Sequence, residues 1–268
     1  MNILFTVCGR AGSKGIKGKN FRDFLGIPLL YYTFAAINLY RDKHPEHQVD
    51  VALNTDSSEM IAMIEGTDAI KAIIVPRKEE LAGDTVAKKL VIADTLNETE
   101  KIKNIKYDMV VDCDITSPLR TVEDIEALIA KAGSFEYDVV FSVVESRRNP
   151  YFNMVKENQD GTVSLVVSSE YTARQQAPAI YDMNASLYAY KTEFLKKETM
   201  ILQGKCGIIK MEDTAVLDLD HENDFELMEV IAEYLIKKKC YKHLQKLFIV
   251  AELLHKNKAA DRAKLIIG

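Results

Sequence analysis

The amino-acid sequence predicts an α/β fold built on a mainly parallel sheet, with one arm inserted into it. Short apolar runs typical of strands alternate with longer amphipathic runs typical of helices, which is the pattern of successive βαβ units. The alternation is interrupted once, over residues 145–181, by a polar segment with the features of a hairpin. The chain has 268 residues, of which 47% are hydrophobic, so it can bury a substantial core around such a sheet.

The first strand and the turn after it carry an unusual charge pattern. The apolar strand Ile3 to Val7 leads into the sequence CGRAGSKGIKGKN, residues 8–20. Although the whole chain has a net charge of -5, no acidic residue stands among the basic residues Arg10, Lys14, Lys17, Lys19 and Arg22. The glycines between them permit a positive φ and a close backbone approach, so peptide N–H groups and lysines can surround phosphate oxygens. We therefore predict a polyanion site at this turn, the alternative being a solvated basic turn.

Two common phosphate loops do not match the turn. A Walker loop places Lys directly before Ser or Thr, whereas here Ser13 precedes Lys14. A dinucleotide fingerprint needs a glycine where Ala11 stands, and the next acid at a strand end, Asp56, comes far later than the usual spacing of about 20 residues. The turn therefore matches neither of these two phosphate loops.

The next elements complete the first βαβ unit and begin another. We expect a helix over residues 27–39 and a strand over 48–53. Asp56 follows this strand, and it either contacts a ligand at the sheet edge or caps a helix over 57–64. After a strand over 70–75 comes Arg77, whose planar guanidinium could read a base edge or could simply be solvated.

The middle of the chain supplies two further strands and a clear helix start. A helix over residues 84–96 precedes a strand over 107–112, and Asp112 and Asp114 alternate at its end, so they point the same way if the strand persists. Thr121 has the spacing to Asp124 of a helix N-cap. Another central strand is expected over residues 138–144.

The inserted arm reads as two short strands joined at residues 159–161. Such a hairpin cannot bury itself alone, so its natural partner is the arm of a second subunit, and we predict a two-fold dimer. Planar hydrogen-bonding side chains follow it, which suit a hydroxyl-rich or carboxylated ligand but need carry no function in a loop: Arg174, Gln175, Gln176 and Asn184.

Two acids near the end of the predicted sheet suggest a metal site. Asp218 and Asp220 share one face of an apolar strand, and paired carboxylates suit Mg²⁺. In the alternative, Asp220 caps a helix that begins near Glu222 and Asp218 is merely exposed. His221 is interpreted as a helix-start residue. Two amphipathic helices follow, which we expect to pack on the core or on another subunit.

Composition excludes several classes of function. The net charge of -5 and a pI of about 5.7 argue against a general nucleic-acid or anionic-membrane binder. Met1 leads directly into a strand, and no apolar run approaches the roughly 20 residues that span a bilayer, so we expect a cytoplasmic protein. The cysteines show no metal spacing and are interpreted as buried, reduced thiols: Cys8, Cys113, Cys206 and Cys240.

Six blocks of sequence together resemble one family. In order, GRAGSKGIKGKN, NTDS, EELAGDT, TSPLRTVEDIE, RQQAP and DLD are similar to the acylneuraminate cytidylyltransferases, the CMP-sialic acid synthetases, over residues 1–235. The stretches YFNMV and YDMNASLY look similar to bacterial members that activate legionaminic-type sugars. The resemblance implies a three-layer Rossmann-like nucleotidyltransferase fold with a dimerisation arm. It also implies transfer of CMP from CTP to the anomeric hydroxyl of a nonulosonic acid, with release of pyrophosphate.

The resemblance further implies a domain layout and roles for site residues. The core would comprise residues 1–144 and 182–235, the arm 145–181, and a C-terminal helical extension 236–268. Mg²⁺ would be bound by Asp218 and Asp220, and the catalytic residues would be Lys14, Lys19 and Asp220, with either Asp220 or a metal-bound hydroxide taking the proton. The nucleotide site would comprise Arg10, Ala11, Gly12, Ser13, Lys14, Lys19, Asn20 and Arg77. The sugar site would comprise Asp114, Thr116, Ser117, Arg120, Arg174, Gln175, Gln176 and Asn184.

Two departures from the family pattern border the implied sugar site. Asp114 and Ile115 stand where many relatives have Gln-Pro, and Phe152 stands where some have Lys. A carboxylate accepts hydrogen bonds but does not donate them, which argues against N-acetylneuraminate as the substrate. Two other functions stay open: activation of an octulosonate or a hexose 1-phosphate, and a non-catalytic nucleotide-binding module. The RQQ and TSPLR blocks count against the former, and retention of the basic residues and both acids counts against the latter.

Overall fold

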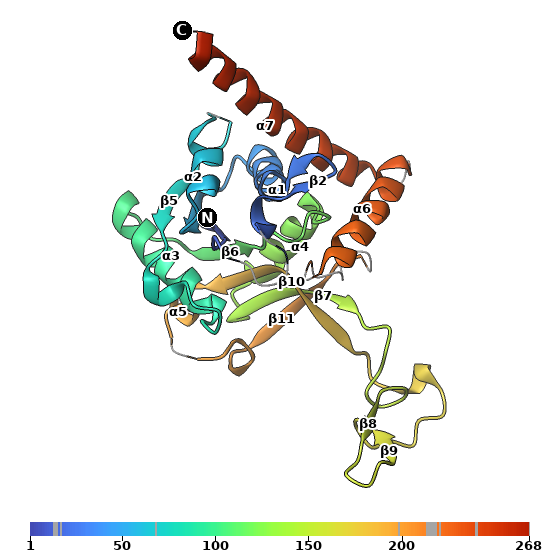
Figure 1. Ribbon diagram of the computed structural model, residues 1–268. Coiled ribbons are helices and arrows are strands. Elements are labelled where there is room, and N and C mark those ends of the chain that lie inside the picture. The colour runs from blue at the N-terminus through green and yellow to red at the C-terminus, as the bar shows by residue number, and fades with distance from the viewer. Residues whose placement is uncertain are drawn as a thin grey trace.

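A seven-stranded sheet lies at the centre of the molecule (Figure 1). The computed structural model describes residues 1–12, 16, 18–67, 69–197, 199–212, 219, 221–238 and 241–267, with 257–267 as backbone alone. Four of the strand pairings are parallel, and only β10 runs antiparallel to its neighbours β6 and β7. In spatial order the strands are β11 (Cys206–Lys210), β7 (Val139–Glu145), β10 (Tyr181–Lys191), β6 (Met109–Cys113), β1 (Asn2–Cys8), β4 (Gln48–Thr55) and β5 (Ile73–Pro76). The predicted mainly parallel sheet is confirmed.

Helices cover both faces of the sheet, which gives three layers. Successive side chains of β1 divide between two cores, with Ile3 and Phe5 on one face and Leu4 on the other. The first core is closed by α1 (Leu29–Lys43), α2 (Ser58–Glu65), α4 (Val122–Ala132), α6 (Glu222–Lys237) and α7 (Lys242–Ile267). The second core is closed by α3 (Lys88–Lys103) and α5 (Thr192–Leu195). Both faces are apolar because the parallel strands are buried on both sides.

Helix starts follow local capping chemistry, with one correction to the sequence prediction. Thr121 caps α4, and its backbone N–H donates to Asp124 Oδ2 at 2.8 Å. The helix predicted from Asp84 begins only at Lys88, because Asp84 lies in the preceding loop, after the short turn η2 (Glu79–Leu81), and pairs with Arg10. That part of the prediction was wrong.

The two C-terminal helices pack on the body of the same chain, one of the two positions expected for them. The Phe248 ring of α7 lies 4.9 Å from the ring of Tyr32 in α1. The Arg22 guanidinium lies 4.3 Å over the ring of Phe225 in α6. His221 is the N-cap residue of α6, which confirms its interpretation as a helix-start residue, whereas Asp220 lies outside the described residues.

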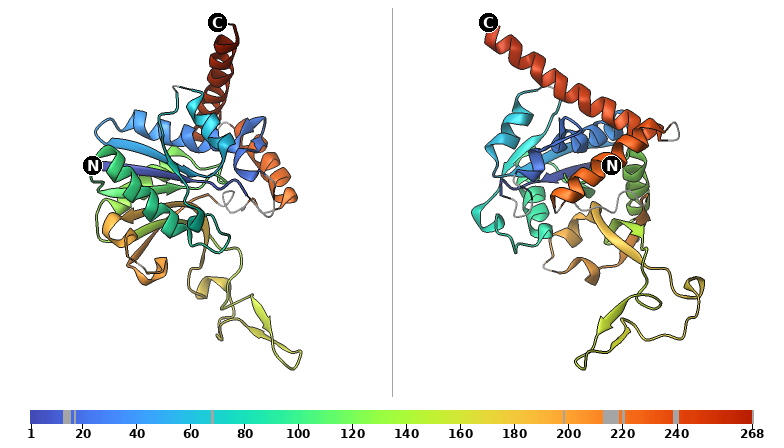
Figure 2. Two further views of the ribbon diagram at one scale, coloured as in Figure 1. Left: turned by 60° about the vertical axis from the view of Figure 1, so that its left-hand side comes forward. Right: turned by 45° about the vertical axis from the view of Figure 1, so that its right-hand side comes forward.

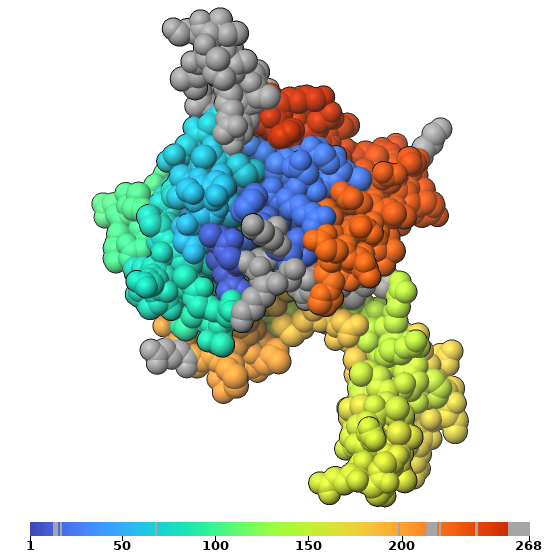
Figure 3. All heavy atoms as spheres, in the orientation of Figure 1, coloured from blue at the N-terminus to red at the C-terminus, as the bar shows by residue number. Residues whose placement is uncertain are grey.

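The arm, residues 146–180, leaves the sheet between β7 and β10 and projects from the body (Figures 1 and 2). Its strands β8 (Val155–Glu157) and β9 (Val163–Leu165) form the predicted antiparallel hairpin. Val155 and Val163 are 60% and 66% exposed, so the hairpin has no apolar cover among the described residues of this chain. Figure 3 shows the arm standing clear of the rest of the molecule.

Strand β10 connects the arm to the centre of the sheet through a bulge. Its outer residues, Tyr181 to Met183, pair with β7 alone, whereas residues 187–191 pair with β6. Between these segments the register shifts, and Ala185 adopts a positive φ of 53°. Ser142 fills the bulge, because its Oγ accepts from Leu187 N at 3.0 Å and donates to Asn184 Oδ1 at 2.6 Å.

Within the described part of the chain, no helix is both long enough and apolar enough to cross a membrane. The smaller elements are the 3₁₀ turns η1 (Lys19–Phe21), η3 (Arg174–Gln176) and η4 (Ile201–Gln203), and the two-stranded pair β2 (Asp23–Phe24) and β3 (Ile27–Pro28).

Candidate active site

A pocket of about 390 Å³ opens where the carboxyl ends of β1, β4 and β6 meet. We call it the edge pocket. Its basic side chains are Arg10, Lys19, Arg77 and Lys88, and its acidic ones are Asp84 and Asp114. Gly12, Asn20 and Thr116 also line it. Ligands of open α/β sheets bind at this edge, and the surplus of positive charge suits a polyanion.

The first loop forms one wall of the edge pocket. Ala11 N donates to Asp56 Oδ1 at 2.7 Å, and Asn20 Nδ2 donates to Arg10 O at 3.1 Å. Asp56 therefore contacts the loop, and the alternative that it caps α2 is wrong, because Ser57 accepts from Met60 N as the cap. Asp56, which directly follows β4, holds the loop through this hydrogen bond. The loop brings together the predicted residues Arg10, Ala11, Gly12, Lys19 and Asn20.

Two glycines permit the close packing of this loop. A Cβ at Gly9 would lie 2.6 Å from Met60 Cε and 2.7 Å from Ile115 Cδ1, so the ends of both buried side chains would have to move to admit a larger residue. Gly18 has a φ of 66°, a left-handed conformation, immediately before η1. The glycines thus let the chain turn back so that Lys19 reaches the pocket.

Arg77 forms another wall and is held rigidly. Its Nε donates to Asn54 Oδ1 at 2.8 Å, and its Nη2 donates to Asn54 O at 3.2 Å. Both acceptors belong to the end of β4. A guanidinium anchored on one side presents its remaining N–H groups in a fixed direction, which fits the predicted role of a planar donor.

Lys88, the first residue of α3, was missed by the sequence analysis. Its Nζ lies 2.8 Å from Asp112 Oδ2 and 2.6 Å from Asp114 Oδ2. Asp112 is fully buried, and its Oδ1 accepts from Thr6 Oγ1 at 2.8 Å. The two acids do point the same way, as predicted, and the cation between them offsets their repulsion.

The same contacts define the charge state of this group. Burial alone would raise the pKa of Asp114, but the Lys88 ammonium and hydrogen bonds from Lys88 and Thr116 outweigh it and hold that pKa well below its usual range. Burial alone would lower the pKa of Lys88, but Asp112 and Asp114 raise it well above its usual value. Asp114 Oδ1 accepts from Thr116 N at 2.8 Å and from Thr116 Oγ1 at 2.6 Å. Both oxygens of Asp114 are thus already engaged, Oδ2 by Lys88 and Oδ1 by Thr116.

Three residues predicted for sugar binding do not line the edge pocket. Arg120 is 1% exposed, and its guanidinium donates to Ser186 O at 3.1 Å and to the carbonyl of Asp114. Asn184 is 3% exposed and sits in the β10 bulge. Ser117 accepts from Arg120 N at 3.4 Å through its carbonyl. These contacts support the sheet around the pocket.

The predicted arm residues line a separate cavity of about 330 Å³, which we call the arm pocket. Arg174 Nη2 donates to Ser146 O at 2.9 Å, and Gln175 lines the same cavity. Gln176 Oε1 accepts from Thr172 N at 3.1 Å, which stabilises the turn η3. Among the described residues, none that lines the arm pocket also lines the edge pocket. One chain therefore does not bring the two predicted halves of the site together.

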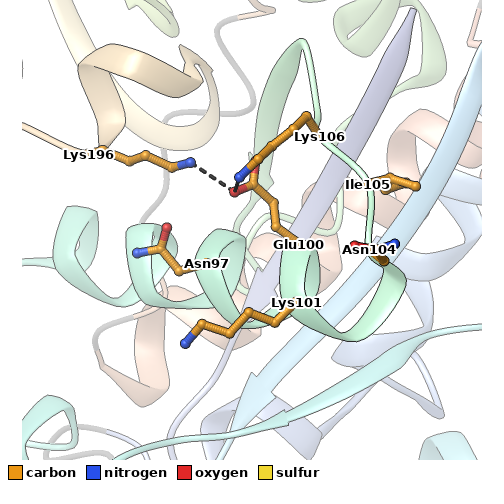
Figure 4. A pocket seen from close by; sticks show the side chains of 7 residues that line it. All are labelled: Asn97, Glu100, Lys101, Asn104, Ile105, Lys106 and Lys196. Carbon is orange, nitrogen blue, oxygen red and sulfur yellow. Dashed lines mark hydrogen bonds and ion pairs between the residues drawn. The ribbon is translucent and has the colours of Figure 1, made fainter.

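A third cavity, of about 620 Å³, lies beside α3 (Figure 4). Its centre is the carboxylate of Glu100, which is 8% exposed and lies 2.7 Å from Lys106 Nζ and 2.9 Å from Lys196 Nζ. Burial alone would raise the pKa of Glu100, but both lysines lower it. The three side chains join α3 to the loop before β6 and to the end of α5, so their contacts have a structural explanation.

The thiols at the sheet edge are unsuited to nucleophilic catalysis. Burial, followed by the charge of Asp112, raises the pKa of Cys8 to about 12, and burial likewise raises the pKa of Cys113 to about 12. Both stay protonated near neutral pH. Cys113 is buried as predicted, and Cys8 and Cys206 are partly exposed free thiols. Four predicted site residues, with Cys240, lie outside the described residues: Ser13, Lys14, Asp218 and Asp220.

These features define an α/β nucleotide-binding protein with a basic pocket at the carboxyl edge of its sheet. Residues 4–253 match the family model described as Cytidylyltransferase, and the chain belongs to that family of nucleotidyltransferases. The family suggested by the motifs is confirmed, and the match runs past residue 235.

Relatives and solved structures agree with this assignment. The chain is 36% identical over 239 residues to post-translational flagellin modification protein B of Campylobacter coli, covering 88% of this chain and 96% of the relative. It is 32% identical to CMP-N,N'-diacetyllegionaminic acid synthase of Campylobacter jejuni subsp. jejuni serotype O:2, covering 85% and 94%. The structure of CMP:2-keto-3-deoxy-manno-octonic acid synthetase complexed with CTP matches with a TM-score of 0.59 at 14% identity, covering 87% and 99%. This structural match confirms the predicted Rossmann-like cytidylyltransferase fold.

Proposed function

We propose that this protein transfers CMP from CTP to the anomeric hydroxyl of a nonulosonic acid of the legionaminic type and releases pyrophosphate. The observation that carries the proposal is the edge pocket, whose basic side chains stand at the carboxyl ends of β1, β4 and β6 in a chain of the cytidylyltransferase family. The name of the relative that shares 32% of its sequence supports the choice of sugar class.

The chemistry is a displacement at phosphorus. The anomeric oxygen forms a bond to the α-phosphorus of CTP, the bond from that phosphorus to the bridging oxygen of the β-phosphate breaks, and the pyrophosphate leaves with the bonding electrons. The hydroxyl proton passes to a base, for which Asp220 is the candidate. Positioning and neutralisation of charge supply most of the catalysis in such reactions. Lys14, Lys19 and Arg10 would neutralise the triphosphate, while Asn20 and Arg77 would orient the cytosine.

We propose that Mg²⁺ binds Asp218 and Asp220 when CTP is present. The described acids at the edge pocket already have partners, since Asp84 pairs with Arg10, and Asp114 pairs with Lys88. The two aspartates of the DLD block are the acids that the family resemblance assigns to the metal, and oxygen ligands suit this ion. Bound Mg²⁺ would polarise the α-phosphate and lower the pKa of the attacking hydroxyl.

On the sugar side, we assign a donor role to Lys88, whose ammonium carries three N–H groups, and an acceptor role to the Thr116 hydroxyl, which already donates to Asp114. Asp114 stands where many relatives have glutamine, but its two oxygens accept from Lys88 and Thr116. A sugar approaching this wall would therefore meet an ammonium group and a threonine side chain rather than a bare carboxylate. The ammonium keeps its proton at neutral pH because its pKa is raised, so it can donate throughout the reaction.

The reaction is tested by measuring pyrophosphate release from CTP with a panel of acids: N-acetylneuraminate, deaminated neuraminate, legionaminate, pseudaminate and an octulosonate. We expect release with a legionaminate-type acid, and loss of that release when EDTA removes Mg²⁺. Release with the octulosonate alone would contradict the nonulosonate assignment. CTP binding without release from any acid would favour a non-catalytic nucleotide-binding module. Fractionation of the native cells would test the cytoplasmic location that we propose.

We propose that the protein works as a homodimer in which the arm of one subunit completes the sugar site of its partner. Val155 and Val163 share the exposed face of the hairpin, while Lys156 lies on the other face. A partner's arm would cover this apolar face and could bring Arg174 and Gln175 to an edge pocket.

Placing aspartate at both valines is expected to convert dimers into monomers, since two charges would be buried at the contact. Light scattering at matched concentration measures the change, and Lys156→Asp on the opposite face is the control. A wild-type protein that is monomeric, or a double variant that is still dimeric, would refute the role of the hairpin.

A further inference from the structure

The turn between α1 and β4 gathers two histidines and a glutamate far from the edge pocket. His44, Glu46 and His47 offer a donor atom each, and these atoms lie within 4.8 Å of one another. β4 begins at Gln48 and reaches the edge pocket at its other end, where Asn54 contacts Arg77. A strand of this length spans about 25 Å, so the cluster belongs to the opposite edge of the sheet.

The imidazole rings of this cluster are held in place by stacking and by the backbone. The His44 ring stacks on Tyr40 at a centroid distance of 4.6 Å, and the His44 and His47 rings lie 5.7 Å apart at an interplanar angle of 15°. His47 N donates to His44 O at 3.1 Å, which closes the turn. The histidine side chains are only 26% and 17% exposed, so their orientation is well defined.

Each histidine has one ring nitrogen engaged by an outer partner. His44 Nε2 lies 2.6 Å from Glu126 Oε1 of α4, and Lys43 Nζ holds the same carboxylate at 2.8 Å. His47 Nδ1 lies 2.7 Å from the Tyr40 hydroxyl. The other nitrogens, Nδ1 of His44 and Nε2 of His47, lie 2.8 Å and 4.0 Å from Glu46 Oε1.

This division of the ring nitrogens is the arrangement that metal-binding histidines show. One nitrogen faces the metal, and the other donates its N–H to a carboxylate or another oxygen that fixes the ring. Here Glu126 and the Tyr40 hydroxyl are the outer acceptors. We propose that this turn binds a first-row transition metal ion such as Zn²⁺ through His44 Nδ1, His47 Nε2 and the Glu46 carboxylate, with water as the fourth ligand.

The three donor atoms already lie within 4.8 Å of one another, and Glu46 is the most exposed of the three ligands. Ligand atoms about 2.0–2.1 Å from a tetrahedral Zn²⁺ lie roughly 3.4 Å apart. The present spacings of 2.8 and 4.0 Å bracket that value. Glu46 is 58% exposed and can shift without disturbing the core. Imidazole ligands select this class of metal over Mg²⁺, so the site is distinct from the metal proposed for CTP.

Titration of metal-free full-length protein with Zn²⁺ in a calorimeter, without CTP, tests the proposal. We expect one ion per chain, with affinity lost in His47→Ala and reduced about 10- to 100-fold in Glu126→Gln, the outer-partner variant. His243→Ala is the matched control, because His243 also contacts a carboxylate, Glu123, but lies outside the cluster. Asp220→Ala should bind Zn²⁺ as the wild type does, which separates this site from the DLD block.

If a variant is less stable than the wild type, thermal unfolding with and without Zn²⁺ separates loss of Zn²⁺ binding from loss of stability. Zn²⁺ should raise the melting temperature of the wild type and of His243→Ala, but not that of His47→Ala or of the second variant His47→Gln. Equal Zn²⁺ affinity in wild type and His47→Ala would overturn the proposal. So would the absence of Zn²⁺ binding, or equal binding of Mg²⁺ at this turn.

Discussion

Replacing Lys88 with methionine is expected to destabilise the protein by about 3 kcal/mol at neutral pH, which is the usual cost of leaving a buried charge without its partner. Methionine preserves most of the aliphatic stem, so the change removes the ammonium rather than the packing. Asp112 is fully buried and would lose the cation that lies 2.8 Å from its Oδ2, and Asp114 would lose the same partner.

The pH dependence of this effect follows from the directions of the pKa shifts. In the wild type, the pKa of Asp114 is lowered and that of Lys88 is raised. The contribution of the pair is therefore fully present from above about pH 4 to about pH 10, the usual carboxyl and lysine values. It is lost only as the pH falls through the lowered pKa of Asp114 or rises through the raised pKa of Lys88. In the variant, the unpaired carboxyls take up protons more readily, so its deficit should shrink as the pH falls from 8 to 5.

Urea unfolding of both proteins at pH 5, 6 and 8 measures this difference. Lys237→Met is the matched control, since the side chains of Lys237 and its partner Glu233 are 76% and 56% exposed. Exposed pairs contribute about 0–1 kcal/mol, so that variant should stay close to the wild type. A Lys88→Met protein as stable as the wild type at pH 8, or equally destabilised at every pH, would contradict the assignment.

Lys19→Ala and Asp220→Ala are each expected to lower the rate of pyrophosphate release by about 100-fold or more, the loss typical when a group that stabilises transition-state charge is removed. The two losses should differ in origin. Lys19→Ala should weaken CTP binding because the pocket loses one of its basic side chains. Asp220→Ala should bind CTP alone normally but lose the strengthening of CTP binding by Mg²⁺.

Steady-state kinetics together with calorimetry of CTP binding, with and without Mg²⁺, separate the two cases. Lys71→Ala, an exposed lysine that does not line the edge pocket, is the control and should keep full activity. All three variants should retain the mass of the wild type in light scattering. Full activity in both Lys19→Ala and Asp220→Ala would exclude the roles assigned to them.

Local pattern was sufficient for the first loop and for β1, β4, β5, β6 and β7, but β10 and β11 were not predicted. The alternation of apolar residues predicted these five strands, and the spacing of Thr121 and Asp124 predicted the start of α4, because these signals depend on neighbours in the sequence. The glycines and basic residues of the first loop predicted the edge pocket for the same reason. Asp84 was placed in a helix because the run behind it has helical periodicity, and its contact with Arg10 is a tertiary one.

The remainder of the site depends on contacts that sequence spacing does not encode. Lys88 begins a charged helix and looks like a solvated surface lysine, yet it meets two acids from the end of β6. The one available signal was the pair of acids itself, since adjacent carboxylates at a strand end need a cation. Arg120 and Asn184 have suitable chemistry for a sugar, but they are only 1% and 3% exposed, and the packing of β10 determines that burial. The relation of the arm to the edge pocket involves a second chain.

The bulge in β10 determines how the arm is attached to the sheet. On the arm side of residues 184–187, Tyr181 to Met183 of β10 are hydrogen-bonded to β7 alone. The arm is therefore attached to the seven-stranded sheet through a two-stranded ribbon. Two-stranded ribbons twist and bend more than the interior of a sheet does. The bulge is therefore the point at which the arm can bend relative to the sheet. Inward of the bulge, Tyr188 pairs with Asp112, the acid that contacts Lys88, so the strand that carries the arm also borders the wall of the edge pocket.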